Sequence, residues 1–145
     1  MDYISFDQKL ALLAVFLQVA LTFYAVIRMG QVRLRVIRVN RIKLSEIAID
    51  NRRYPEEAQV FANNLSNQFE TPVLLYAVVL FATVYDVSSP VFAWLCMGYV
   101  ATRYVHRYIH VRGNNVVRRF QVYLIGLGFL GLAWVVLGLR LIGFV

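Results

Sequence analysis

Polar residues interrupt the second apolar segment of the chain at a regular spacing. Asn63, Asn67 and Glu70 are four and three residues apart, which places them on one face of a helix. Glu70 is followed by fifteen uncharged residues, so we expect its carboxylate near or inside a membrane boundary, facing a cationic partner. Pro72 lacks an N–H group and favours a kink near Gln68. Such a stripe is also typical of residues that only join helices by hydrogen bonds.

Cationic and aromatic side chains recur at helical spacing in the last two apolar segments. Arg103, His106 and His110 are three and four residues apart, and Arg119 precedes Tyr123 by four. Guanidinium groups bind carboxylates through paired hydrogen bonds. A guanidinium beside a thiol also stabilises the thiolate, which is the nucleophilic form. These residues favour a pocket for a small ligand that carries carboxylates and an amine.

Arg33, near the end of the first apolar segment, brings a further cation to the same end of the predicted bundle. A simpler interpretation is a solvated basic rim that touches anionic lipid headgroups. That interpretation accounts well for Arg28, Arg38 and Arg112, but poorly for the carboxylate of Glu70. A ligand pocket at this end therefore remains the stronger hypothesis.

Two other chemistries are compatible with some of these residues. His106 and His110 have the i, i+4 spacing of zinc ligands, but no cysteine or second acid is placed to complete a site. Nearby arginines would also repel a cation, so we expect no metal. A proton or ion pathway through Glu70 stays an alternative, because acids within a membrane often belong to one.

Long apolar segments must position these side chains. Hydrophobic residues make up 60% of the 145-residue chain, and residues 10–27 and 120–139 carry no charge. About 20 apolar residues cross a bilayer as a helix, which satisfies the backbone within the segment. We expect an all-α membrane protein, a four-transmembrane-helix bundle forming a single domain over residues 1–145. Its helices are predicted at about 6–36, 56–86, 90–111 and 115–142.

Basic residues are concentrated on two of the connections. Of 15 lysines and arginines, eight lie in residues 28–53 and five in residues 103–119. This positive-inside pattern predicts that both connections face the cytoplasm and that both termini lie on the opposite side. The net charge of +7 is thereby explained by topology, and we expect no nucleic-acid partner.

Four short motifs on the predicted helices resemble those of one membrane family. They are Gly30–Arg35, Asn67-x-x-Glu70, Arg103-x-x-His106 and Arg119-x-x-x-Tyr123. Together they are similar to motifs of the MAPEG family, the membrane-associated proteins in eicosanoid and glutathione metabolism. The family includes microsomal glutathione transferases and prostaglandin E synthases. The resemblance implies a homotrimer with glutathione sites between neighbouring subunits, and glutathione as a cosubstrate.

The resemblance also implies roles for individual residues. Arg119 stands where the family has an arginine that activates the glutathione thiol, so it is the expected catalytic residue. The expected glutathione-binding residues are Arg33, Asn67, Glu70, Arg103, His106, His110 and Tyr123. The thiolate would attack a lipophilic electrophile, or reduce a lipid hydroperoxide, that arrives from the bilayer.

Some residues depart from the family pattern. Asn63 and Ser66 stand where a related enzyme has arginines, His110 replaces a tyrosine, and Phe120 replaces a serine. These changes remove cationic contacts to glutathione and argue against prostaglandin isomerisation. The leading hypothesis is a membrane-bound glutathione-dependent transferase or peroxidase of a bacterial inner membrane. The alternative is a non-catalytic protein of the same fold that binds a lipid or a membrane partner.

Overall fold

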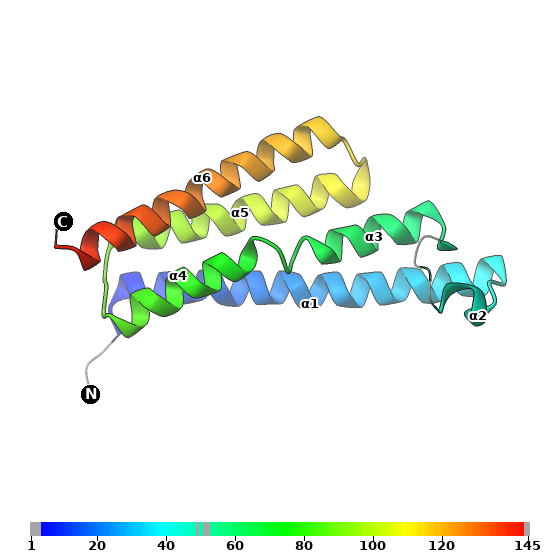
Figure 1. The fold of residues 1–145 in the computed structure, drawn as a ribbon, viewed down its shortest axis with the longest axis horizontal. Coiled ribbons are helices and arrows are strands. Elements are labelled where there is room, and N and C mark those ends of the chain that lie inside the picture. Colours follow the sequence, from blue (N-terminus) through cyan, green and yellow to red (C-terminus); the bar gives the residue numbers. More distant parts are fainter. Residues whose placement is uncertain (1–3, 49, 51–52, 144–145) are drawn as a thin grey trace.

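The computed structural model describes residues 4–48, 50 and 53–143, and within them every regular element is helical. The long helices are α1 (Phe6–Asn40), α5 (Pro90–Arg112) and α6 (Val116–Leu141), and the shorter ones are α2 (Leu44–Ile47), α3 (Glu56–Ser66) and α4 (Pro72–Val84). Figure 1 shows α3 and α4 lying in sequence along α1, with α5 and α6 beside each other above them. The start of α1 and the end of α6 lie at one end of the bundle, while α2 and the α5–α6 turn lie toward the other.

The prediction of one helix over residues 56–86 is wrong, because the chain forms α3 and α4 with a break between them. Pro72 is the first residue of α4, a position where its missing N–H is not needed. Ahead of it, tight turns replace helical bonding: Gln68 N–H donates to Leu65 O at 2.8 Å and Phe69 N–H to Ser66 O at 2.9 Å. The proline therefore starts a new helix rather than bending an existing one.

The other predicted helices lie close to the observed ones. The first extends to Asn40 rather than residue 36, and the connection that follows contains the short α2. In the described residues, α1 and α6 alone are long and apolar enough to cross a membrane by themselves. The 13 residues of α4 rise only about 20 Å as a helix, so crossing a bilayer there would require α3 as well.

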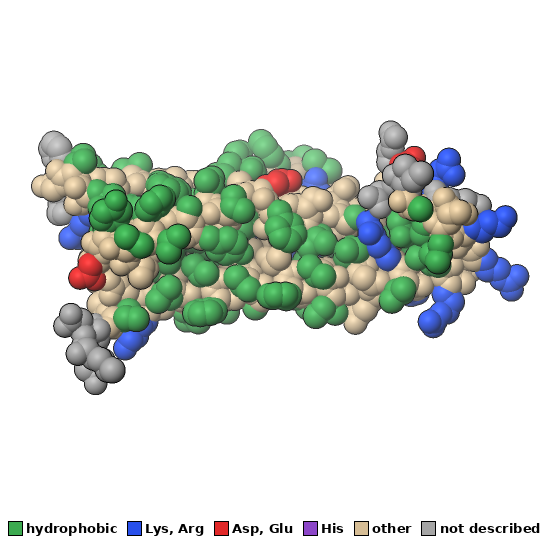
Figure 2. All heavy atoms as spheres, turned by 60° about the horizontal axis from the view of Figure 1, so that its bottom comes forward, with side chains coloured by type: hydrophobic (Ala, Val, Ile, Leu, Met, Phe, Trp, Pro, Cys, Tyr) green, Lys and Arg blue, Asp and Glu red, His purple; other side chains and the backbone are tan. Residues whose placement is uncertain are grey.

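Hydrophobic side chains cover the middle of the molecule, and basic side chains gather at the end that carries α2 (Figure 2). Inside, small residues such as Ala14 and Ala93 meet larger ones such as Tyr99 and Leu130 in a core shared by α1, α4, α5 and α6. Outward-facing large residues such as Phe16 remain exposed. This distribution suits a protein whose middle contacts lipid or further copies of the chain.

A buried chain of polar contacts joins α1, α3 and α5. Gln18 Nε2 donates to Gln68 Oε1 at 3.0 Å, and Gln68 Nε2 donates to Asn64 O at 3.2 Å. The Asn64 side chain accepts from Arg107 and lies 3.5 Å from His110 Nδ1. These contacts fix α3 and the break against the rest of the bundle.

Candidate functional site

The break between α3 and α4 exposes backbone groups that a continuous helix would have used. Asn67 ends α3 as its C-cap, and its carbonyl accepts a hydrogen bond from Arg103 Nη2 at 2.6 Å. Just beyond, Thr71 Oγ1 lies 2.9 Å from the hydroxyl of Tyr99. Two side chains of α5 thereby fix both sides of the break, and with it the position of Glu70.

The turn before α6 fixes Arg119. Asn115 caps the helix, its Oδ1 accepting from Arg118 N–H at 3.0 Å. Asn114 has a φ of 44°, in the left-handed region that asparagine tolerates better than most residues. Its Oδ1 accepts from Arg119 Nη1 at 2.7 Å. The turn thus also orients the guanidinium of Arg119, the residue that the family resemblance marks as catalytic.

The break and the turn before α6 border a cavity of about 170 Å³, which we call the Arg119 cavity. Five of the eight predicted site residues line it together with Val116 and Phe120; they are Asn67, Glu70, His106, Arg119 and Tyr123. The rings of His106 and Tyr123 lie 6.2 Å apart. Residues from the break, α5 and α6 therefore meet in a single cavity.

Buried polar atoms beside this cavity have no hydrogen-bond partner among the described residues. They are Arg103 Nε and Nη1 and His106 Nδ1, and the Arg103 side chain is only 2% exposed. Buried polar groups are nearly always paired with protein or ordered water. Their free donor and acceptor capacity next to the Arg119 cavity is what a polar ligand or bound water would satisfy.

Glu70 has a different environment from the one predicted. Its side chain is exposed, and it forms no ion pair with another described residue. It shares the cavity with Arg119, so a carboxylate and a guanidinium line the same space without direct pairing. Both charges are thereby left available to a ligand with complementary groups.

Arg33, Arg103 and His110, the other three predicted binding residues, do not line this cavity. Arg33 lies over the ring of Tyr54, 4.8 Å from its centroid. Arg103 is buried and does not line the cavity, but it donates to the carbonyl of Asn67, a residue that does. His110 packs 5.9 Å from the ring of His106 and lines a separate cavity of about 320 Å³.

The sequence reading missed a second set of polar residues. Asn64 and Gln68 are four residues apart and fully buried, while Asn63 of the predicted stripe is exposed. The signal was present, because Gln18 is a polar residue inside an otherwise apolar segment and needs an interior partner. Zinc ligation by His106 and His110 would need further ligands, and the described residues contain no group of three His, Cys, Asp or Glu side chains close enough to hold a metal.

Comparison with protein families gives a match to the model of the MAPEG family over residues 11–139. Comparisons with curated proteins and with solved structures found no match. The family match includes every residue that lines the Arg119 cavity and most of each of the two helices that are long and apolar enough to cross a membrane. Because it covers nearly the whole chain, it shows that the protein belongs to the MAPEG family.

Proposed function

We propose that the protein is a membrane-bound glutathione-dependent transferase, with reduction of lipid hydroperoxides as a related activity. The observation that carries this proposal is the meeting of Arg119, Glu70 and Asn67 in one cavity. Glutathione offers two carboxylates, an ammonium group, peptide amides and a thiol. The cavity and its surroundings offer a complement to each of these groups.

Arg119 is the residue assigned to the thiol. Its guanidinium, oriented by Asn114, stabilises the thiolate and so raises the fraction of the nucleophilic form. In conjugation, the sulfur forms a bond to an electrophilic carbon while the leaving group departs with its electron pair. In peroxide reduction, two glutathione molecules give their disulfide, and the hydroperoxide gives an alcohol and water.

Glu70 and Asn67 are assigned to the γ-glutamyl end of glutathione. The Glu70 carboxylate accepts from the ammonium group, and the Asn67 amide bonds to the peptide. Arg103, whose Nε and Nη1 have no partner among the described residues, supplies donors for a ligand carboxylate. Phe120 is 57% exposed at the rim and gives a lipophilic substrate an apolar approach.

The cavity in one chain is too small to enclose this ligand alone. Small-molecule sites usually measure about 300–1,000 Å³, whereas this cavity measures about 170 Å³. We assign the missing wall to a neighbouring copy in a homotrimer, which contributes its own Arg33. Arg33 belongs to the Gly30–Arg35 motif of the family, yet it lies against Tyr54 and not in the Arg119 cavity of its own chain. A site shared between subunits accounts for both facts.

Titration calorimetry with glutathione tests the assignment on the detergent-purified protein. Arg119→Ala and Glu70→Gln should both lose binding, by about tenfold or more, since each removes a charged hydrogen bond. Arg118→Ala is the matched control. Arg118 is the neighbouring residue and carries the same charge, but it is exposed and does not line the cavity. Equal losses in the variants of Arg118 and Arg119 would contradict a specific role for Arg119.

Turnover separates the two enzymatic activities from the non-catalytic alternative. Conjugation is followed with 1-chloro-2,4-dinitrobenzene and peroxide reduction with cumene hydroperoxide, each in the presence of glutathione. We expect conjugation that depends on Arg119 and not on Arg118. A trimer that binds no glutathione and turns over neither substrate would instead favour a lipid- or partner-binding protein of the same family.

A further inference from the structure

A second cavity, of about 440 Å³, lies between α1, α3 and α5 and shares no lining residue with the Arg119 cavity. Its polar wall consists of three arginines and three tyrosines, namely Arg28, Arg107, Arg112, Tyr24, Tyr104 and Tyr108. None of its described lining residues is acidic. A cavity with three guanidinium groups and no carboxylate is a site for an anion.

Neutral partners hold all three guanidinium groups in place. Arg107 donates to Asn64 Oδ1 and stacks over the ring of Tyr24, with 4.6 Å between the guanidinium carbon and the ring centroid. Arg112 lies 5.0 Å from the ring centroid of Tyr108.

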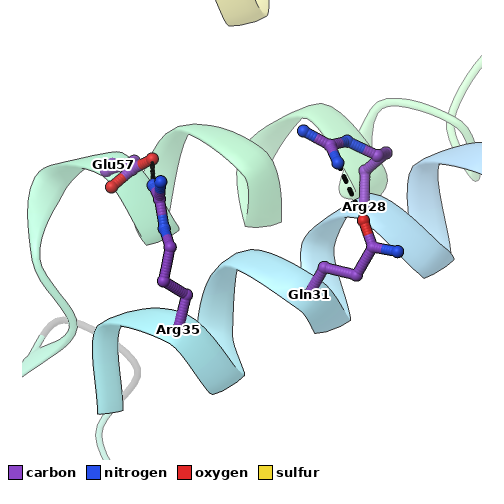
Figure 3. A network of polar contacts seen from close by, with 4 residues as sticks. All are labelled: Arg28, Gln31, Arg35 and Glu57. Carbon is purple, nitrogen blue, oxygen red and sulfur yellow. Dashed lines mark hydrogen bonds and ion pairs between the residues drawn. The ribbon is translucent and has the colours of Figure 1, made fainter. Parts of the chain in front are cut away.

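Arg28 is held in the same neutral way, since its Nη1 donates to Gln31 Oε1 at 2.8 Å (Figure 3). Arg35 lies one turn after Gln31 on α1, and it is paired with the carboxylate of Glu57 on α3 (Figure 3). Glu57 also lines adjoining hollows with Arg28 and with Arg112, but its carboxylate is paired with Arg35 and is not part of the wall of this cavity.

Arg107 makes the strongest demand for an anion. Its side chain is only 5% exposed, and an uncompensated charge away from water is costly. Arginine forks match the geometry of phosphate oxygens and can bind them in pairs. A phosphate group would therefore neutralise Arg107 while Arg28 and Arg112 close on it from the exposed side.

The cavity lies at the depth of lipid headgroups. Residues 10–27 of α1 are uncharged and rise about 27 Å as a helix, close to the roughly 30 Å thickness of the hydrocarbon layer. Arg28 is the first charged residue beyond them and therefore marks the boundary. Tyrosines gather at this level in membrane proteins, and three of them line this cavity.

We propose that this cavity binds the phosphate-bearing headgroup of an anionic phospholipid from the adjoining leaflet. The arginines hold the phosphate, and the apolar part of the wall, formed by Leu21, Phe61 and Val111, receives the start of the acyl chains. The bound lipid ties α1, α3 and α5 together at the basic end of the bundle. The proposal does not depend on glutathione chemistry, because the two cavities have separate walls.

Native mass spectrometry of the full-length protein, released from nanodiscs, measures the bound lipid. The nanodiscs contain equal amounts of phosphatidylglycerol and phosphatidylcholine. The test variant is Arg28→Gln with Arg112→Gln, both exposed positions whose replacement leaves the buried Arg107 contacts intact. The matched control is Arg38→Gln with Arg41→Gln, which removes two exposed basic residues outside the cavity.

Wild type and the Arg38/Arg41 control should retain phosphatidylglycerol over phosphatidylcholine, and the Arg28/Arg112 variant should retain about tenfold less of it. Equal retention of the two lipids by wild type would overturn the proposal, as would equal losses in the two double variants. A parallel thermal unfolding measurement in detergent compares inorganic phosphate with phosphatidylglycerol. Stabilisation by phosphate as large as that by the lipid would assign the site to a soluble phosphate compound and overturn the lipid assignment.

Discussion

Arg103 is the residue on which the geometry of the Arg119 cavity depends. It is buried on α5, and it reaches across to the carbonyl that the end of α3 leaves unused. A neutral donor could cap that carbonyl equally well, so the charge of Arg103 points to a second task. Its Nε and Nη1 have no partner among the described residues, and we propose that they donate to a carboxylate of the ligand.

Replacing Arg103 by methionine should destabilise the protein and weaken glutathione binding together. Methionine keeps most of the stem volume but leaves the Asn67 carbonyl without its donor, which costs about 1–3 kcal/mol. Arg103→Lys should recover part of the stability through its single ammonium group and little of the binding, because it lacks the paired donors. Thermal unfolding in detergent and titration calorimetry measure the two effects, with Arg118→Met as the exposed control. An Arg103→Met protein as stable as wild type would show that the cap contributes nothing.

At the scale of elements, the break between α3 and α4 brings the Asn67–Glu70 motif to the cavity. Pro72 allows the sequence to predict a disturbance near this position. It does not predict a full break, because the turn is fixed by contacts from α5: Arg103 to the Asn67 carbonyl and Tyr99 to Thr71. Such long-range contacts are invisible to local spacing. Local spacing was enough to select Asn67 and Glu70 as candidates. It missed the buried Asn64, because the contact by which Asn64 orients Arg107 joins two distant helices.

The close approach of α5 and α6 involves a glycine on each helix, and a Cβ at Gly98 of α5 would lie 2.9 Å from Phe129 Cε1. A Cβ at Gly126 would lie 2.5 Å from Thr102 Oγ1, whereas a Cβ at Gly128 would meet nothing within 4 Å. Gly126 therefore lets α6 approach α5 within the chain, whereas Gly128 faces open space. Because α5 carries His106 and α6 carries Arg119, their separation also sets the width of the cavity.

Gly126→Ala should therefore lower the free energy of unfolding by about 1–3 kcal/mol, the usual cost of overpacking. Thermal unfolding in detergent, at constant protein and detergent concentration, provides the measurement. Gly128→Ala is the matched control on the same helix and should stay close to wild type, since alanine is the better helix former. Comparable losses in the two variants would mean that helix packing around Gly126 is looser than described.

For the whole molecule, the sequence predicted the long apolar helices and the basic end correctly, but it did not predict individual side-chain contacts. Long uncharged segments led to α1 and α6, because apolar length alone determines such helices. The charge pattern placed the basic residues at one end, which Figure 2 shows. The position of Arg33 against Tyr54 was not predictable, since it depends on how the connection after α1 folds back.

The orientation of the bundle in the membrane follows from its basic end and stays a prediction. In a Cys96→Ala background, Arg41→Cys reports the basic end and Ser88→Cys the opposite end, both at exposed positions. In spheroplasts of a bacterial host, a membrane-impermeant maleimide should label the cysteine at position 88 directly and that at position 41 only after lysis. The reverse labelling would place the Arg119 cavity on the other side of the membrane.

The proposed site between subunits of a trimer can be tested without a structure of the assembly. Arg33→Ala and Arg119→Ala should each abolish turnover, because each removes one half of every site. In trimers that mix the two variants at random, a site built from Arg33 of one chain and Arg119 of its neighbour is intact in about a quarter of cases. Restored activity near that level would establish the interface site, because a site built within one chain cannot be restored by mixing. Continued inactivity in proven mixed trimers would return Arg33 to the basic rim and leave the Arg119 cavity to be completed by another group.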